Sequence, residues 1–151
     1  MNIRYVILAK YAEFTADSTL NMIGGDFDKI ETADFPCLIP SVLAAVKIEL
    51  TPENCGRRYA IVGSVVQPET GEVLGTSDTH ELLPFDPSSL GPSSPIELGL
   101  VIQIPNVEVA EPGTYEFHVT INDVPQTPKP RLRVGPVGSM RRVFLEKREV
   151  Q

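Results

Sequence analysis

The 151-residue sequence has no tryptophan, only two histidines and two cysteines, and no long hydrophobic run. Two histidines exclude a three-histidine metal site, and neither a Gly-rich phosphate loop nor a Gly-x-Ser-x-Gly motif is present. The apolar run at residues 5–9 ends at Lys10, short of the roughly 7–15 apolar residues of a secretory signal and the roughly 20 of a membrane span. The sequence predicts no catalytic activity, no cofactor and no membrane segment.

The two cysteines are expected to be free thiols. Cys37 precedes the strand-like segment at residues 42–50, and Cys55 follows it. A strand of that length separates its ends by about 25–30 Å at ~3.3 Å per residue, whereas a disulfide needs Cα atoms within about 7 Å. Free thiols and the lack of an export signal together predict a cytoplasmic protein.

The charge is strongly one-sided, with 20 acidic against 13 basic residues and a net charge of −7. An acidic surface repels the phosphates of nucleic acids and of anionic membranes. We therefore expect neither of these as a partner.

Alternation of apolar and polar residues is the dominant pattern. At residues 112–121 a Pro-Gly pair is followed by Tyr115, Phe117, Val119 and Ile121 with polar residues between them. This period of two indicates a strand with one buried face. Most of the chain shows the same pattern between Pro and Gly turns, and no segment has a convincing helical period.

Eight such segments predict an all-β fold, an antiparallel two-sheet β-sandwich of jelly-roll or immunoglobulin-like type. Residues 1–136 would form its single domain. The connection at residues 84–95, rich in Pro and Ser, is either a crossover between sheets or a binding loop. The expected strands are residues 3–12, 19–30, 42–50, 58–66, 72–83, 98–104, 112–121 and 129–134.

Single residues refine these expectations. Gly24 and Gly25 suggest a bulge or bend within the second strand, and Gly71 supplies the positive φ of a tight hairpin. Pro128 and Pro130, two apart, are typical of a protected edge strand.

Several short motifs resemble a family of small bacterial proteins known only as a domain of unknown function. The resemblance covers about residues 3–134 and implies a bacterial origin and a β-sandwich, but no activity or site. The motifs are Tyr5-x-x-x-Ala9-x-Tyr11-Ala12, Leu20-Asn21-x-x-Gly24 with Ile30, Phe35-Pro36, and Pro112-Gly-x-Tyr-x-Phe117.

His80 is the first candidate for chemistry because Asp78 and Glu81 flank it. One histidine and one carboxylate on a strand face are too few ligands for catalytic zinc. The expected hairpin pairs His80 with Tyr59 and leaves Cys55 some 13 Å away, too far for a Cys–His dyad. We expect a solvated or hydrogen-bonded His80. A mixed metal site would require it to converge with His118.

The C-terminal tail, residues 137–151, differs from the acidic body. It carries four basic and two acidic residues, which leaves the rest of the chain at −9. The tail is either a solvated end or a strand that adds to an open sheet edge. The second alternative predicts a protein partner or a homodimer, bound through Arg141, Arg142, Val143, Phe144 and Leu145.

These features predict a non-catalytic interaction or structural module. A small-ligand or carbohydrate-binding sandwich, with residues 84–95 as its rim, is the first alternative, although the lack of tryptophan disfavours a sugar platform. A metal-dependent enzyme is the second.

Overall fold

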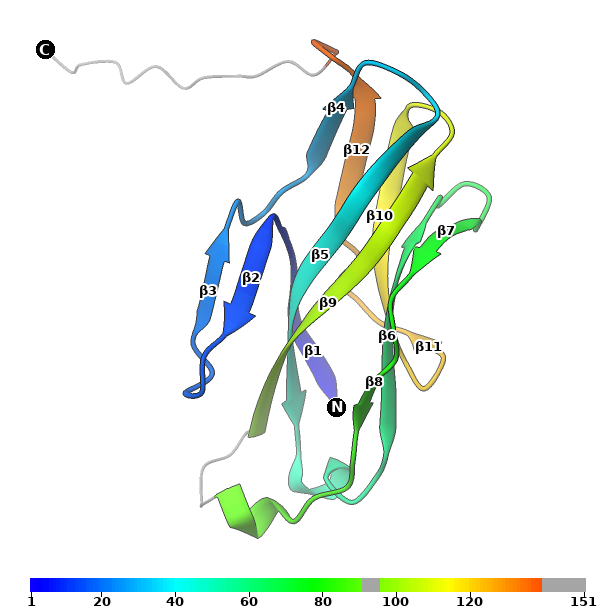
Figure 1. Ribbon diagram of the computed structural model, residues 1–151. Coiled ribbons are helices and arrows are strands. Elements are labelled where there is room, and N and C mark those ends of the chain that lie inside the picture. The colour runs from blue at the N-terminus through cyan, green and yellow to red at the C-terminus, as the bar shows by residue number, and fades with distance from the viewer. Residues whose placement is uncertain (91–95, 140–151) are drawn as a thin grey trace, which may run out of the picture.

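The computed structural model describes residues 1–90 and 96–139, and over these residues the protein is all-β (Figure 1). Twelve strands and two short 3-10 helices form there, with no α-helix. No helix in this part of the chain is long and apolar enough to cross a membrane. The strands are β1 (Asn2–Ala9), β2 (Tyr11–Phe14), β3 (Leu20–Ile23), β4 (Lys29–Thr32), β5 (Cys37–Leu50), β6 (Tyr59–Val66), β7 (Val73–Thr76), β8 (His80–Leu82), β9 (Ile96–Val109), β10 (Gly113–Ile121), β11 (Val124–Pro125) and β12 (Arg131–Pro136); the 3-10 helices are η1 (Pro52–Asn54) and η2 (Pro87–Leu90).

The strands form three sheets, so the expected two-sheet, eight-strand arrangement is wrong in both numbers. One sheet has the order β1-β5-β9, and β2 pairs with β3 in a separate hairpin. The largest has the order β4-β12-β10-β6-β7, with β8 also on β6 and β11 also on β10. Pairing is antiparallel except between β4 and β12, which are parallel. The all-β class is confirmed, but the purely antiparallel pattern is not.

Three predicted strands are each divided in two, and local backbone geometry accounts for the breaks. Residues 3–12 divide at Lys10, where the chain turns from β1 into β2. Residues 19–30 divide after β3, where Gly24 and Asp26 adopt φ of 61° and 57°, a region that an extended strand cannot continue through. The expected bend at Gly24 is therefore a strand end, and the chain passes from the hairpin to the largest sheet.

The third break, within residues 72–83, is bridged by Ser77. Its backbone N–H donates to Gly63 O at 2.8 Å, and its hydroxyl accepts from Gly63 N at 2.9 Å. Both bonds keep the chain attached to β6 between β7 and β8. Gly71 has φ of 75° in the turn before β7, as predicted.

The main core lies between the β1-β5-β9 sheet and the largest sheet. Phe117 on β10 and Ile102 on β9 are almost wholly buried in it. Gly63 on β6 allows this close approach, because a Cβ there would lie 2.5 Å from Ile102 Cγ2 and 3.0 Å from Phe117 Cζ. The alternation predicted at residues 112–121 is confirmed, since Tyr115, Phe117, Val119 and Ile121 all face this core.

A smaller outer core lies on the opposite face of the three-stranded sheet, under the β2–β3 hairpin. Its buried members are Ala9, Ala12 and Ala45, with Phe14, Leu20, Leu43 and Val101 packed around them. Gly99 on β9 leaves room for the hairpin, since a Cβ there would lie 2.5 Å from Phe14 Cδ1. The three-stranded sheet is therefore covered on both faces.

Two further expectations on the late strands are corrected. β12 lies between β4 and β10, so it is not the edge strand that Pro128 and Pro130 suggested; both prolines precede it. His80 pairs with Ile61, and Tyr59 pairs with Leu82, two residues from the expected register. The β6–β7 pairing shifts by one residue between Val65 and Val66, and the pairing with β6 shifts by one more between β7 and β8.

The predicted long connection at residues 84–95 contains the short helix η2 rather than irregular loop alone. Asp86 precedes this helix, and its carboxylate accepts hydrogen bonds from Ser88 N at 2.9 Å and Ser88 Oγ at 2.7 Å. These bonds lower the pKa of Asp86. Residues 91–95 lie outside the described part of the chain.

Candidate interaction surface

The partner-binding residues expected from the sequence lie outside the described residues. Arg141, Arg142, Val143, Phe144 and Leu145 follow Ser139, the last residue described. The described residues form the surface to which such a segment would bind.

The β2–β3 hairpin carries the clearest such surface, which we call the hairpin surface and define by Tyr11, Met22 and Ile23. Their exposed fractions are 49%, 41% and 67%. Tyr11 and Ile23 are direct cross-strand partners, and Met22 is adjacent to Ile23 on β3. Because side chains alternate along a strand, Tyr11 and Ile23 share one face of the hairpin, and Met22, opposite Ala12, lies on the other face. Two large apolar side chains are thus exposed together on one face and a third on the other, whereas single exposed apolar residues are ordinary on protein surfaces.

β3 also presents an unpaired edge. In the described structure its single partner strand is β2, and Figure 1 shows β3 on the outer side of β2. Natural edge strands are usually protected from pairing by lysine, proline or a bulge. β3, with the sequence Leu-Asn-Met-Ile, has none of these. Its free backbone N–H and C=O groups can therefore accept another strand.

The residues of the hairpin itself carry only negative charge, but one cation, Lys10, lies at its base, where Lys10 N donates to Ile23 O at 3.0 Å and the lysine side chain lies beside Gly24. Residues 11–26 contain Glu13, Asp17 and Asp26 and no lysine or arginine. Glu13 is fixed beside the hairpin surface, since Tyr11 OH donates to its Oε2 at 3.0 Å. This hydrogen bond and the negative charge of Glu13 raise the pKa of Tyr11.

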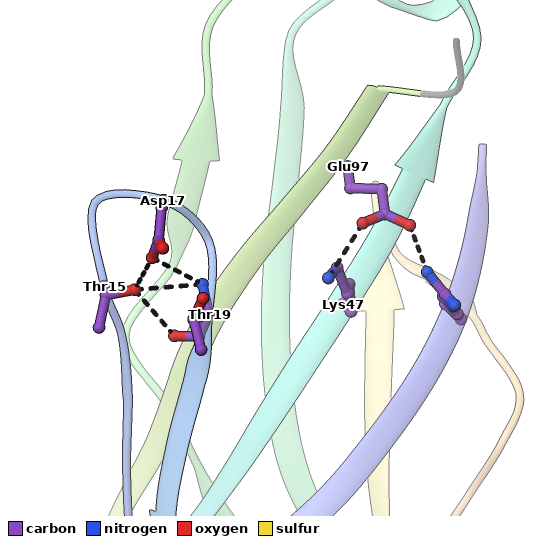
Figure 2. Close-up of polar contacts among 6 residues, drawn as sticks. Thr15, Asp17, Thr19, Lys47 and Glu97 are labelled. Atoms are coloured by element: carbon purple, nitrogen blue, oxygen red, sulfur yellow. Dashed lines mark hydrogen bonds and ion pairs between the residues drawn. The ribbon is translucent and has the colours of Figure 1, made fainter. Parts of the chain in front are cut away.

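The turn between β2 and β3 is held by a local polar network, shown in Figure 2. The Thr15 hydroxyl donates to Asp17 Oδ1, and Thr19 N donates to Thr15 Oγ1 at 3.2 Å and to Asp17 Oδ1 at 3.3 Å. These bonds, with the Thr15 hydroxyl first, lower the pKa of Asp17. The network fixes the turn and thereby the position of β3.

An ion-pair cluster lies on the same sheet that supports the hairpin. Glu97 on β9 accepts from Lys47 Nζ on β5 at 3.0 Å (Figure 2) and also pairs with Arg4 on β1. The Lys47 contact is the main reason that the pKa of Glu97 is lowered. The Glu97 carboxylate thus links β1, β5 and β9. Glu97 lies two residues before Gly99, the glycine against which Phe14 packs.

The two histidines lie on opposite faces of the largest sheet. His80 pairs with buried Ile61 and therefore faces inward at the sheet margin, bordering a shallow depression of about 300 Å³ with Asp78 and Gln103. His118 faces outward, with its Nε2 3.1 Å from Glu116 Oε1. The convergence that a mixed metal site requires is therefore not formed, and the described residues contain no group of three or more potential metal ligands.

The two cysteines are at opposite ends of β5, and both are free. Cys37 begins the strand, and Cys55 is buried beyond its other end with Sγ 3.5 Å from Thr51 O. The geometry agrees with the expected separation of the two thiols by the long strand.

A second acidic surface lies where β7, β9 and β10 meet. It is a depression of about 350 Å³ bordered by Glu72, Glu108 and Glu111. Tyr115 OH donates to Glu111 O at 2.6 Å, and burial is the main cause of its raised pKa. Acidic charge alone specifies no ligand. Like the hairpin, however, this depression could attract a basic segment by its charge.

Sequence reasoning missed the hairpin surface because it placed Met22 and Ile23 inside a long strand. Two signals pointed to it: the Gly24-Gly25 pair that ends β3, and the absence of any cation between residues 11 and 26.

Comparison with known proteins places the chain in a family but not in a function. No curated protein matches it. A solved structure that resembles it is the Pseudomonas fluorescens alkylpurine DNA glycosylase AlkC bound to DNA containing an abasic site analog, with a TM-score of 0.48 and 9% identity. The match covers 89% of this chain but 30% of that one, and at this TM-score it supports no inference about fold or function. Residues 4–134 match a family of unknown function (DUF6941), and the chain therefore belongs to that family.

Proposed function

We propose that the protein is a non-catalytic interaction module that pairs with a second copy of itself. The basic tail of one copy, residues 140–151, adds as a strand to the open β3 edge of the other. The observation that carries the proposal is the hairpin surface, where an unpaired strand edge, exposed apolar side chains and acidic charge coincide.

The tail has the chemistry that this surface selects. Arg141 and Arg142 precede three apolar residues, Val143 to Leu145, and Lys147 and Arg148 follow them. Charge attraction to the three hairpin carboxylates, opposed in part by Lys10 at the base of the hairpin, brings the segment near, although it is screened over about 8 Å at physiological salt. Strand addition then supplies main-chain hydrogen bonds that are independent of side-chain identity.

The apolar contribution is larger than the electrostatic one. Burying each of Val143, Phe144 and Leu145 contributes on the order of 1.5–3 kcal/mol. Ordering the segment costs about 1–2 kcal/mol per residue in backbone entropy, so apolar contact alone does not hold it. An open strand edge is required, because only new backbone hydrogen bonds between strands offset the rest of the entropy cost.

Exchange between two copies is favoured over docking within one chain. β12 ends at Pro136, opposite Thr32 at the far end of β4, whereas β3 precedes the other end of β4. A tail docking in its own chain would have to run back along the molecule. Reciprocal exchange between two copies forms two identical contacts per dimer, as closed two-fold assemblies do.

Light scattering on the full chain and on a chain ending at Ser139 tests the proposal. We expect a dimer for the first and a monomer for the second. Ile23→Lys, which puts a charge on the open edge, should also give a monomer. Val124→Lys on β11 is the matched control, because Val124 is 58% exposed and Ile23 is 67% exposed, and it should leave the dimer intact.

Two results would contradict the proposal. One is a monomeric full chain at concentrations of tens of micromolar. The other is a dimer that Ile23→Lys leaves intact but Glu108→Gln with Glu111→Gln dissociates, which would move the docking site to the second acidic depression. A monomeric full chain in which hairpin exchange protection depends on the tail would show docking within one chain instead.

The non-catalytic part of the proposal has its own measurement. Elemental analysis of untagged protein should find less than one equivalent of zinc, iron or manganese per chain. A full equivalent would favour the metal-dependent alternative. Cytoplasmic location and bacterial origin stay predictions.

A further inference from the structure

A basic patch that the sequence did not suggest lies on the outer face of the largest sheet. Leu132 and Val134 on β12 face the main core, so Arg131 and Arg133, which alternate with them, face outward. On β4 the same alternation directs Ile30 inward and Lys29 outward. Three cations therefore share one face of two adjacent strands.

Strand register brings these cations together with a hydroxyl. Arg133 lies opposite Lys29 on one side and opposite Thr114 on the other. Arg131 is two residues along the same strand, roughly 6.6 Å away at ~3.3 Å per residue. Together with Asp28, the two arginines and Thr114 line a depression of about 310 Å³.

The cations of this patch have no ion-pair partner among the described residues, unlike Arg4 and Lys47, which share Glu97. Glu116 is directly opposite Arg131 but is 3.1 Å from His118 instead. Asp28 is the carboxylate at the rim of the depression, and its backbone carbonyl accepts from Arg133 N at 2.8 Å. The depression itself is therefore lined by two arginines and one carboxylate, Asp28. Glu116 lies on the same outer face, and so does Glu31, which is two residues from Lys29 and whose carboxylate accepts from Gly138 N at 3.2 Å.

We infer that this depression binds the phosphate group of a small phosphate monoester. Arginine forks bind phosphate oxygens in pairs, with short charge-assisted hydrogen bonds. Thr114 adds a neutral donor between the strands, and Lys29 adds a point charge at the margin. A nucleic acid or an anionic membrane would bring many phosphates against an acidic body, whose repulsion disfavours it. The inference is independent of the proposed dimer.

Titration with inorganic phosphate and with glycerol 2-phosphate, followed by amide NMR at constant ionic strength, tests this. Saturable shifts are expected at Thr114, Arg131 and Arg133, with tighter binding of the monoester than of chloride. Arg131→Gln with Arg133→Gln should weaken binding by at least about tenfold. Thr114→Val should weaken it about fivefold, because it removes one neutral hydrogen bond. All three positions are exposed, so these variants should fold.

Arg57→Gln with Arg58→Gln is the charge-matched control, because both residues are exposed in the turn before β6. It should leave the affinity unchanged. An equal loss of affinity in the control variant would show that the effect depends on net charge and not on this depression, and it would overturn the inference. So would shifts that do not saturate, or tighter binding of a short single-stranded oligonucleotide than of the monoester.

Discussion

The two cores of this protein differ in the side chains that build them. The main core contains large residues such as Phe117, Ile102 and Leu132, drawn from both larger sheets. The outer core, under the hairpin, has buried members that are all alanine. Because hydrophobic stabilisation scales with buried apolar area, the main core should hold the fold together, whereas the outer core only attaches the hairpin.

The difference between the two cores indicates that the hairpin can open locally without unfolding of the whole domain. Elements with few buried apolar contacts open at lower free energy than the rest of a domain. The hairpin is such an element, and it also carries the open β3 edge. A partner strand can therefore pair with this edge without disturbing the main core.

The largest expected effect comes from emptying the main core. Phe117→Ala should lower the free energy of unfolding by about 3–5 kcal/mol, because a 1%-exposed aromatic ring leaves a cavity that the sheets cannot close. Urea unfolding followed by tyrosine fluorescence or circular dichroism measures this. A loss below ~1 kcal/mol would contradict the assignment of this core as the stabilising one.

Overfilling the same core should cost less. Gly63→Ala puts a Cβ 2.5 Å from Ile102 Cγ2, and we expect a loss of about 1–3 kcal/mol in the free energy of unfolding. Gly56→Ala is the control, since nothing lies within 4 Å of its Cβ position. Equal stability of the two variants would mean that β6 and β9 are less closely packed than described.

The equivalent change in the outer core should act locally. Gly99→Ala displaces Phe14, whose Cδ1 would lie 2.5 Å from the new Cβ. We expect amide protection in β3 to fall about tenfold while global stability changes by less than ~1 kcal/mol. Hydrogen exchange resolved by NMR separates these effects. Loss of protection throughout β10 as well would show that the two cores unfold together.

The smallest effect concerns the hairpin turn. The pKa of Asp17 is lowered below 3.8 by its bonds from Thr15 and Thr19. A lowered folded pKa contributes stability that is present above the unfolded value and is lost as the pH falls through the folded value. Asp17→Asn should therefore weaken β3 protection at pH 7, with the difference from wild type vanishing in acid.

The Asp17 carboxyl can also be titrated directly by NMR. Thr15→Val should return its pKa towards 3.8, because the Thr15 hydroxyl is the largest cause of the shift. An unchanged pKa in that variant would transfer the stabilising role to the Thr19 contacts.

Local pattern located the extended segments, but it did not give all of their breaks or their partners. The alternation at residues 112–121 corresponds to β10 within one residue, because a single strand's burial depends on its own period. The expected register of His80 was wrong because the return strand shifts twice against β6, first between Val65 and Val66 and again between β7 and β8. The edge assignment at Pro128 and Pro130 was wrong because β4, about 100 residues earlier in the chain, pairs with β12.

The sequence alone determined the all-β class, the family, the separation of the two cysteines and the acidic body with a basic tail. These follow from composition and from periods that each segment carries by itself. The tertiary structure decided that there are three sheets, that Tyr11, Met22 and Ile23 are exposed beside an open edge, and that Lys29, Arg131, Arg133 and Thr114 meet on one face. Such groupings depend on pairing between segments that are distant in the sequence. The alternation along a strand predicts the face on which a side chain lies, but it does not predict which strand lies beside it.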